Sequence, residues 1–132
     1  MQLLPLRLTP GVDLRLAIES AAVTQVEESA FVVAGIGSLS EASLRYAGEV
    51  TETKIAGPLD ILSLSGTLTP SGAHLHMSVS NASGQVFGGH MNYGNVVRTT
   101  AEVLLAPLHE WSLTREHDAA TGFNELVVRR RE

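Results

Sequence analysis

The sequence predicts an α+β fold in which one main helix packs on a single, mostly antiparallel β-sheet. A segment near the N-terminus has helical apolar spacing, and the segments after it have the alternating or short apolar patterns of strands. Packing one helix on one sheet buries the apolar side of both elements. The chain has 132 residues, which is one domain's length, so we expect a single domain over residues 1–132.

The helix is expected to begin after Asp13, a favourable N-cap residue, and to run to about Glu28. Its apolar stripe consists of Leu14, Ala17, Ile18, Ala21 and Gln25 or Val26. Strands are expected over Leu3–Leu8, Phe31–Ile36, Leu44–Tyr46, Asp60–Thr69, Ala73–Asn81, Gln85–Met91, Val96–Leu105, Trp111–Arg115 and Phe123–Val128.

Charge and composition argue against several classes of function. The formal net charge of −5 disfavours nucleic-acid binding, because phosphate contacts need a basic surface. The one basic run, at residues 129–131, is expected to be a solvated tail. No segment has the length and apolarity of a membrane helix, and the N-terminal residues lack the features of a signal peptide. We therefore expect a cytoplasmic protein without a membrane partner.

The glycine-containing segment 35–40 starts like a dinucleotide-binding loop. It lacks the third glycine, and strands rather than a helix are expected after it. We expect Gly35 and Gly37 to allow close packing or a bulge instead.

Two histidines lie on one face of an alternating strand. His74 and His76 share a face with Ser78 and Ser80, whereas the intervening residues are apolar. Residues i and i+2 of a strand are about 6.6–6.8 Å apart, so both imidazoles can reach a single ion. The chain has no cysteine, so any metal site must use His, Asp or Glu.

The segment Thr69-Pro70-Ser71-Gly72 fits a type I turn, and this turn sets the register of a hairpin. The polar pairs are then Thr67 with His74, Ser65 with His76 and Ser63 with Ser78, and the apolar pairs are Leu68 with Ala73, Leu64 with Met77 and Leu62 with Val79. Polar and apolar faces match on both strands, which supports the hairpin.

His90 is the third candidate ligand, but its parity needs a correction. Pairing that starts from a turn at residues 81–84 puts Gly89 opposite His76 and His90 on the wrong face. An extra loop residue or a bulge would restore the parity, and we expect a bulge at Gly88-Gly89. Three imidazoles with an open coordination position suit zinc first. Imidazole also binds iron, nickel, copper and manganese, so these ions are the alternatives. His109 and His117 have no matching partners and are expected at the surface.

Motifs in a fixed order extend over nearly the whole chain. They are Arg7-Leu8-x-Pro10-Gly11-x-Asp13-Leu14, Gly35 to Leu39, Ala42-x-Leu44-Arg45, Ile61 to Thr67, His74-Leu75-His76, Gly88-Gly89-His90, Thr100 to Val103 and Thr121-Gly122-x-x-Glu125-Leu126. In this order they resemble the plants-and-prokaryotes-conserved (PPC) domain, which is also the domain of AT-hook nuclear proteins.

The resemblance implies a PPC-domain fold and a homotrimer with its pocket near a subunit boundary. Bacterial members are described as candidate DNA-binding proteins because plant relatives carry an Arg-Gly-Arg-Pro AT-hook, which is absent here. In the plant partner-binding segment Gly-Arg-Phe-Glu-Ile-Leu, this chain has Pro58 for Arg and Asp60 for Glu, so that role is not expected. The fold is also similar to acetolactate decarboxylase, whose three zinc-binding histidines match His74, His76 and His90.

Three functions remain open. The first is a metal-dependent lyase or hydrolase, or a small-molecule binder, in which Arg45 would pair with a ligand carboxylate or phosphate. Glu102 is its candidate proton carrier, with Asp60 second. The alternative is a transcription-associated oligomeric protein without an AT-hook, for which direct DNA contact is doubtful. The third is a trimeric structural protein with vestigial histidines.

Overall fold

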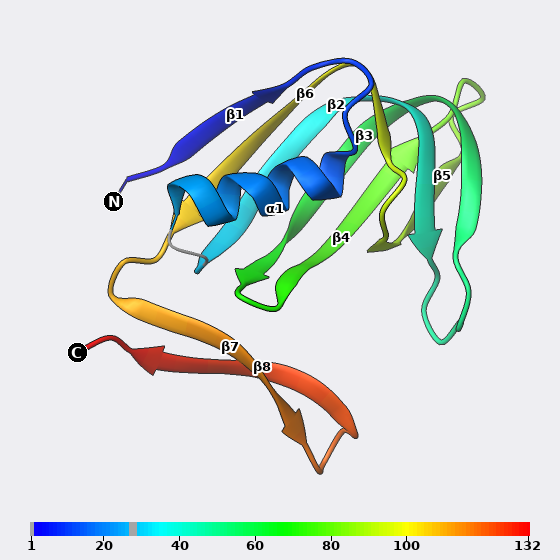
Figure 1. Ribbon diagram of the computed structural model, residues 1–132. Coiled ribbons are helices and arrows are strands. Elements are labelled where there is room, and N and C mark those ends of the chain that lie inside the picture. Colours follow the sequence, from blue (N-terminus) through cyan, green and yellow to red (C-terminus); the bar gives the residue numbers. More distant parts are fainter. Residues whose placement is uncertain (1, 27–28) are drawn as a thin grey trace.

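The computed structural model describes residues 2–26 and 29–132 and confirms the α+β architecture. The elements are β1 (Leu4–Leu8), α1 (Leu14–Gln25), β2 (Ala30–Arg45), β3 (Thr53–Thr69), β4 (Gly72–Ser80), β5 (Val86–Met91), β6 (Val96–Pro107), β7 (Trp111–Asp118) and β8 (Phe123–Arg130). Figure 1 shows α1 lying across one face of the main sheet, while the β7–β8 hairpin lies apart from it. No helix within the described ranges is long and apolar enough to cross a membrane.

The main sheet has the strand order β1-β6-β2-β3-β4-β5, and its pairings are antiparallel. The far end of β2 also pairs with β5, with Leu44 opposite Met91 and Arg45 opposite His90. Strands β2 to β5 therefore close on themselves at this end. This closure brings Arg45 beside a predicted metal ligand.

The expected separate strands Phe31–Ile36 and Leu44–Tyr46 are wrong, because β2 is one continuous strand. Register shifts interrupt its pairing near Gly37 and Leu39, and such bulges bend a strand without ending it. A Cβ on Gly37 would lie 2.5 Å from the Thr100 carbonyl oxygen, so glycine allows close packing there as predicted. The next strand, β3, also begins earlier than expected, at Thr53 rather than Asp60.

Helix α1 begins as predicted, and its apolar stripe faces the sheet. The Leu16 amide donates to Asp13 Oδ1 at 3.1 Å, which satisfies one of the free N–H groups at the helix start. Leu14 and Ile18 are fully buried in the core between helix and sheet. The helix ends at Gln25 with Val26 as its C-cap, and the last two residues of its expected range, Glu27 and Glu28, lie outside the described residues.

The β3–β4 hairpin has the predicted register from its turn through Ser63. Thr67 pairs with His74, Ser65 with His76, and Ser63 with Ser78. The expected pairing of Leu62 with Val79 is wrong, because a register shift between Ile61 and Ser63 places Ile61 opposite Val79. Leu62 is the extra residue and is 52% exposed. This bulge lies beyond the histidines and leaves their face unchanged.

The next hairpin corrects the parity of His90 in its loop. Pairing is regular from Ser80–Val86 to His76–His90, so the bulge expected at Gly88-Gly89 is wrong. The Gly84 amide donates to the Asn81 carbonyl, and the Asn81 amide donates to the Gln85 carbonyl. Gly84 has φ +79°, so a turn plus one left-handed residue lengthens the loop by one position. An extra loop residue, the alternative to a bulge that the sequence allowed, therefore aligns His90 with His76.

Gly66 lies where the two strands of the β3–β4 hairpin are tightly packed. A Cβ at this position would collide with the carbonyl oxygen of His74 on the neighbouring strand. Gly66→Ala is therefore expected to lower the free energy of unfolding by roughly 1–3 kcal/mol, as overpacking typically does. Urea unfolding measures the change.

Gly88→Ala is the matched control, because its added Cβ would meet Met77 oxygen at an ordinary 3.4 Å. Equal stability of the two variants would contradict the packing described for Gly66.

Candidate metal centre

His74 and His76 on β4 and His90 on β5 form one cluster. One nitrogen from each ring lies within 4.8 Å of the others. The ring centroids are 5.2 Å apart for His74 and His76, 5.3 Å for His74 and His90, and 4.4 Å for His76 and His90. Ligands of one tetrahedral zinc with bonds of about 2.0–2.1 Å lie about 3.3 Å apart. Small side-chain rotations span the difference, so the group can hold a metal ion.

In the metal-free protein, the pKa values of two of these histidines, His74 and His90, are shifted toward the neutral form. Partial desolvation and the neighbouring Arg115 lower the pKa of His74 below its ordinary value of 6.5. Desolvation and Arg45 lower the pKa of His90 in the same direction. Metals bind the unprotonated imidazole, so both shifts reduce competition from protons at neutral pH.

Two arginines flank the cluster in an open cavity of about 910 Å³. Arg45 comes from β2 and donates to the Glu49 carbonyl oxygen at 3.0 Å. Arg115 comes from β7 and donates to Thr67 Oγ1 at 2.7 Å. Both line this cavity together with His74, His90 and residues of the loop after β2 and of β8. The structure therefore brings Arg45 to the histidines, as the sequence hypothesis required.

Helix α1 holds the two histidine-bearing strands together. Arg15 donates to the Ala73 carbonyl oxygen on β4 and to the Met91 carbonyl oxygen on β5, each at 2.9 Å. The Ala73 amide in turn donates to Glu19 Oε2 at 2.8 Å, and Tyr93 donates to Glu19 Oε1 at 2.7 Å. Ala73 precedes His74 and Met91 follows His90. These contacts therefore fix the backbone beside both ligands.

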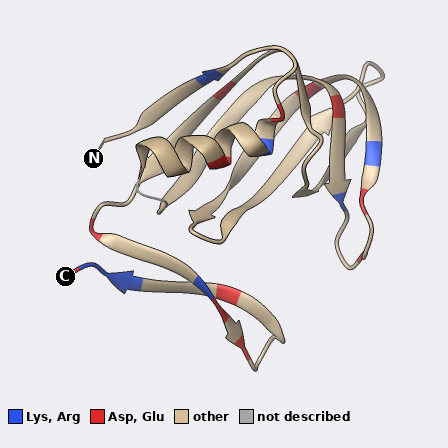
Figure 2. Ribbon diagram, in the orientation of Figure 1, with Lys and Arg blue, Asp and Glu red and all other residues tan. Residues whose placement is uncertain are grey.

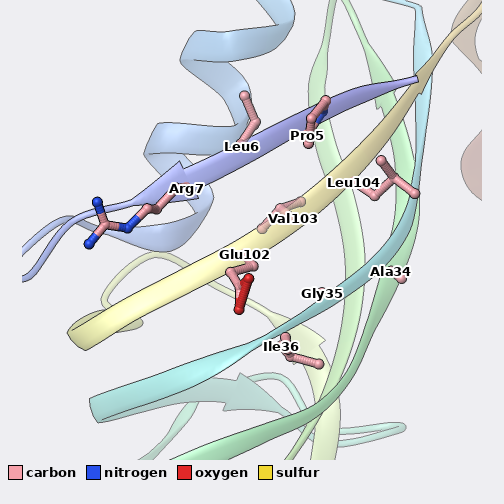
Figure 3. Close-up of a pocket in the computed structure, with 9 residues that line it drawn as sticks. All are labelled: Pro5, Leu6, Arg7, Ala34, Gly35, Ile36, Glu102, Val103 and Leu104. Atoms are coloured by element: carbon pink, nitrogen blue, oxygen red, sulfur yellow. The ribbon is translucent and has the colours of Figure 1, made fainter. Parts of the chain in front are cut away.

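The two proton carriers predicted from the sequence lie away from the histidines. Glu102 on β6 faces Arg7 of β1 in the register and lines a separate cavity of about 610 Å³. Figure 3 shows it between Arg7 on one neighbouring strand and Ile36 on the other. That cavity shares no lining residue with the one beside the histidines. Asp60 pairs with Ser80, at the end of β4 away from His74.

The remaining surface predictions are mostly confirmed. His109 and His117 are exposed. The basic run 129–131 is exposed, but its side chains make contacts within the β7–β8 hairpin, which differs from the expected solvated tail. Arg129 pairs with Glu116 at 2.7 Å, and the Arg130 guanidinium lies 4.7 Å from the centroid of the Trp111 ring.

Sequence reasoning missed Arg15, Glu19 and Arg115. Arg15 and Glu19 are four residues apart on one helix, the spacing of an ion pair, and this signal was available. Arg115 carried no such signal, because it reaches His74 from a hairpin outside the main sheet.

Comparison with known proteins assigns this chain to a family. The model of the Plants and Prokaryotes Conserved (PCC) domain, also abbreviated PPC, matches residues 1–109, and the chain belongs to this family. Curated relatives include the bifunctional protein GlmU of Synechococcus sp. strain JA-2-3B'a(2-13), 43% identical over 128 residues. That match covers 97% of this chain but only 20% of the relative, so the chain spans about a fifth of its length.

Solved structures share the fold closely. A hypothetical protein from Salmonella matches with a TM-score of 0.94 and 35% identity, covering 99% of this chain and 95% of the other. A metal-containing protein from Archaeoglobus fulgidus matches with a TM-score of 0.81 and 29% identity, covering 96% and 94%. A candidate DNA-binding protein from Bacteroides thetaiotaomicron has a TM-score of 0.80 over 95% and 91% of the chains, but at 16% identity this shows the fold alone.

The lowered histidine pKa values predict how stability varies with pH in chelator-treated protein. The folded state binds fewer protons than the unfolded state below the unfolded pKa of about 6.5. Stability is therefore expected to be retained above that pH and to fall as the pH drops from about 7 to 5. Urea unfolding across this range measures the slope.

The double variant His74→Asn/His90→Asn is expected to flatten this slope, whereas His109→Asn/His117→Asn leaves it unchanged. If the slope persists in the first double variant, the assigned pKa shifts are wrong.

Proposed function

We propose that His74, His76 and His90 bind one divalent transition metal, with zinc the first candidate, at a site for a small molecule. The observation that carries this proposal is the convergence of three imidazoles beside a cavity lined by Arg45 and Arg115. A donor set of three neutral imidazoles suits zinc and leaves a coordination position for water or a ligand. The metal-containing relative from Archaeoglobus supports metal binding without identifying the ion.

The chemistry open to such a site is that of a lyase or hydrolase. When bound, the metal would supply Lewis acidity that polarises a carbonyl or activates water. Around it, Arg45 is suited to orient an anionic group, because guanidinium binds carboxylate through two parallel hydrogen bonds. Within the described residues, the cavity lining includes Glu125, a carboxylate close enough to influence the His74 pKa. Glu125 therefore replaces Glu102 as the carboxylate best placed to move a proton.

Elemental analysis tests the metal site directly. Untagged protein purified without added metal is expected to carry close to one zinc or related ion per chain, because all three ligands come from one chain. His76→Ala is expected to lose it, since two imidazoles bind much more weakly than three.

His109→Ala and His117→Ala are matched controls, as exposed histidines outside the cluster, and should retain the wild-type content. Metal-free wild-type protein that also fails to bind added zinc would reject the proposal.

The transcription-associated alternative has less physical support. Figure 2 shows Lys and Arg distributed over several elements and interspersed with Asp and Glu. The net charge is −5, and a binder of duplex DNA needs a concentrated basic face to displace phosphate counterions. Cytoplasmic location stays a prediction.

A homotrimer is part of the same proposal. The β7–β8 hairpin lies apart from the main sheet, and it exposes 72% of Phe123 and 54% of Val128. Exposed apolar residues on a projecting hairpin favour burial against a second copy. Light scattering is expected to give about three times the chain mass of 14.0 kDa. A monomer at micromolar concentration would contradict the assembly.

A further inference from the structure

Arg115 makes a contact that blocks a metal ligand. Its Nη2 atom lies 3.1 Å from Nδ1 of His74 and 2.7 Å from Thr67 Oγ1. A guanidinium nitrogen can donate hydrogen bonds but has no lone pair to accept one. His74 Nδ1 must therefore be the acceptor, and the proton of the neutral ring then resides on Nε2.

This hydrogen bond leaves His74 without a lone pair for a metal. A metal bound at Nδ1 would occupy the position that Arg115 now contacts. A metal bound at Nε2 would move the ring proton to Nδ1, where it would face the Arg115 N–H. Either mode of coordination breaks the Arg115–His74 contact. Metal and Arg115 therefore compete for the same histidine.

Once Arg115 has left His74, the charges in the cavity determine which group it pairs with. Arg115 would remain in the cavity beside a divalent cation, with Arg45 on the same lining. The two arginines and the cation repel one another, and an anion that enters the cavity offsets this repulsion. A carboxylate can ligate the metal through one oxygen and accept hydrogen bonds from a guanidinium. Glu125 also lines the cavity and is the internal competitor for the released side chain.

Building on the metal site proposed above, we propose that Arg115 is a metal-displaced switch for a small carboxylate ligand. Without metal, Arg115 donates a hydrogen bond to His74 Nδ1. With metal bound, this hydrogen bond is broken, and Arg115 and Arg45 bind the carboxylate of the molecule that completes the coordination. Metal and carboxylate then bind with positive coupling, and Arg115 is the positioning residue that links them. It lies beyond residues 1–109, the part matched by the family model.

The experiment uses full-length protein titrated with Zn²⁺ against a competing chelator, and then Co²⁺ protein titrated with acetate. Acetamide serves as the neutral control ligand, and the Co²⁺ absorption spectrum reports ligand entry. Arg115→Met keeps the stem of the side chain but removes the charge and the donors. It is expected to bind Zn²⁺ about tenfold more tightly, as loss of one competing charged hydrogen bond implies. It is also expected to lose the spectral response to acetate.

Arg129→Met is the matched control, because Arg129 lies on the same hairpin but pairs with the exposed Glu116. It should bind zinc and acetate like the wild type. Circular dichroism checks that the variants are folded. Histidine NMR of the metal-free wild type needs no variant and is expected to show His74 protonated at Nε2.

The outcomes separate this switch from the metal site itself. Absence of zinc binding in wild type and variants alike would reject the metal site. Zinc binding with unchanged or weaker affinity in folded Arg115→Met, or a His74 protonated at Nδ1, would overturn the switch. A response to acetate that survives Arg115→Met would reject the role of Arg115 in carboxylate binding, and its loss in Arg45→Met would assign that role to Arg45 alone.

Discussion

The antiparallel register of β3, β4 and β5 is the constraint on which the candidate site depends. A shift of one residue in either hairpin would move a histidine to the core face, because side chains alternate along a strand. The proline-containing turn sets the first register, and the left-handed Gly84 sets the second. Helix α1 then ties both strands through Arg15, so the element that covers the core also fixes the site.

The charge around the histidines gives the site a chemical preference. Arg15, Arg45 and Arg115 approach from the helix, the sheet and the separate hairpin. Their positive charge opposes a cation unless anionic ligands accompany it, which favours a ternary complex over a metal bound alone. Desolvation first, and then the charge of Arg115 beside His74 and of Arg45 beside His90, lowers the pKa of these two histidines. The proposed metal binding and the proposed anion binding thus depend on one arrangement of charges.

The sequence predicted those parts of the fold that local patterns determine. Alternation identified the face of His74 and His76, and the turn chemistry gave the pairing through Ser63. It misplaced the correction for His90, because a three-residue loop and a strand bulge restore parity equally well. Glu102 was linked to the site by residue type alone, and the structure places it at a different cavity. Arg115 could not be found, because the approach of the β7–β8 hairpin to His74 is a tertiary property without a local signal.

The most direct test of the central claim is anomalous diffraction from crystals grown with one equivalent of zinc. Data collected on either side of the zinc absorption edge locate the ion independently of any assumed ligand. The account predicts one strong peak among the rings of His74, His76 and His90, with a nitrogen of each at about 2.0–2.1 Å. A peak only at His109 or His117, or no peak with the three rings ordered, would contradict it.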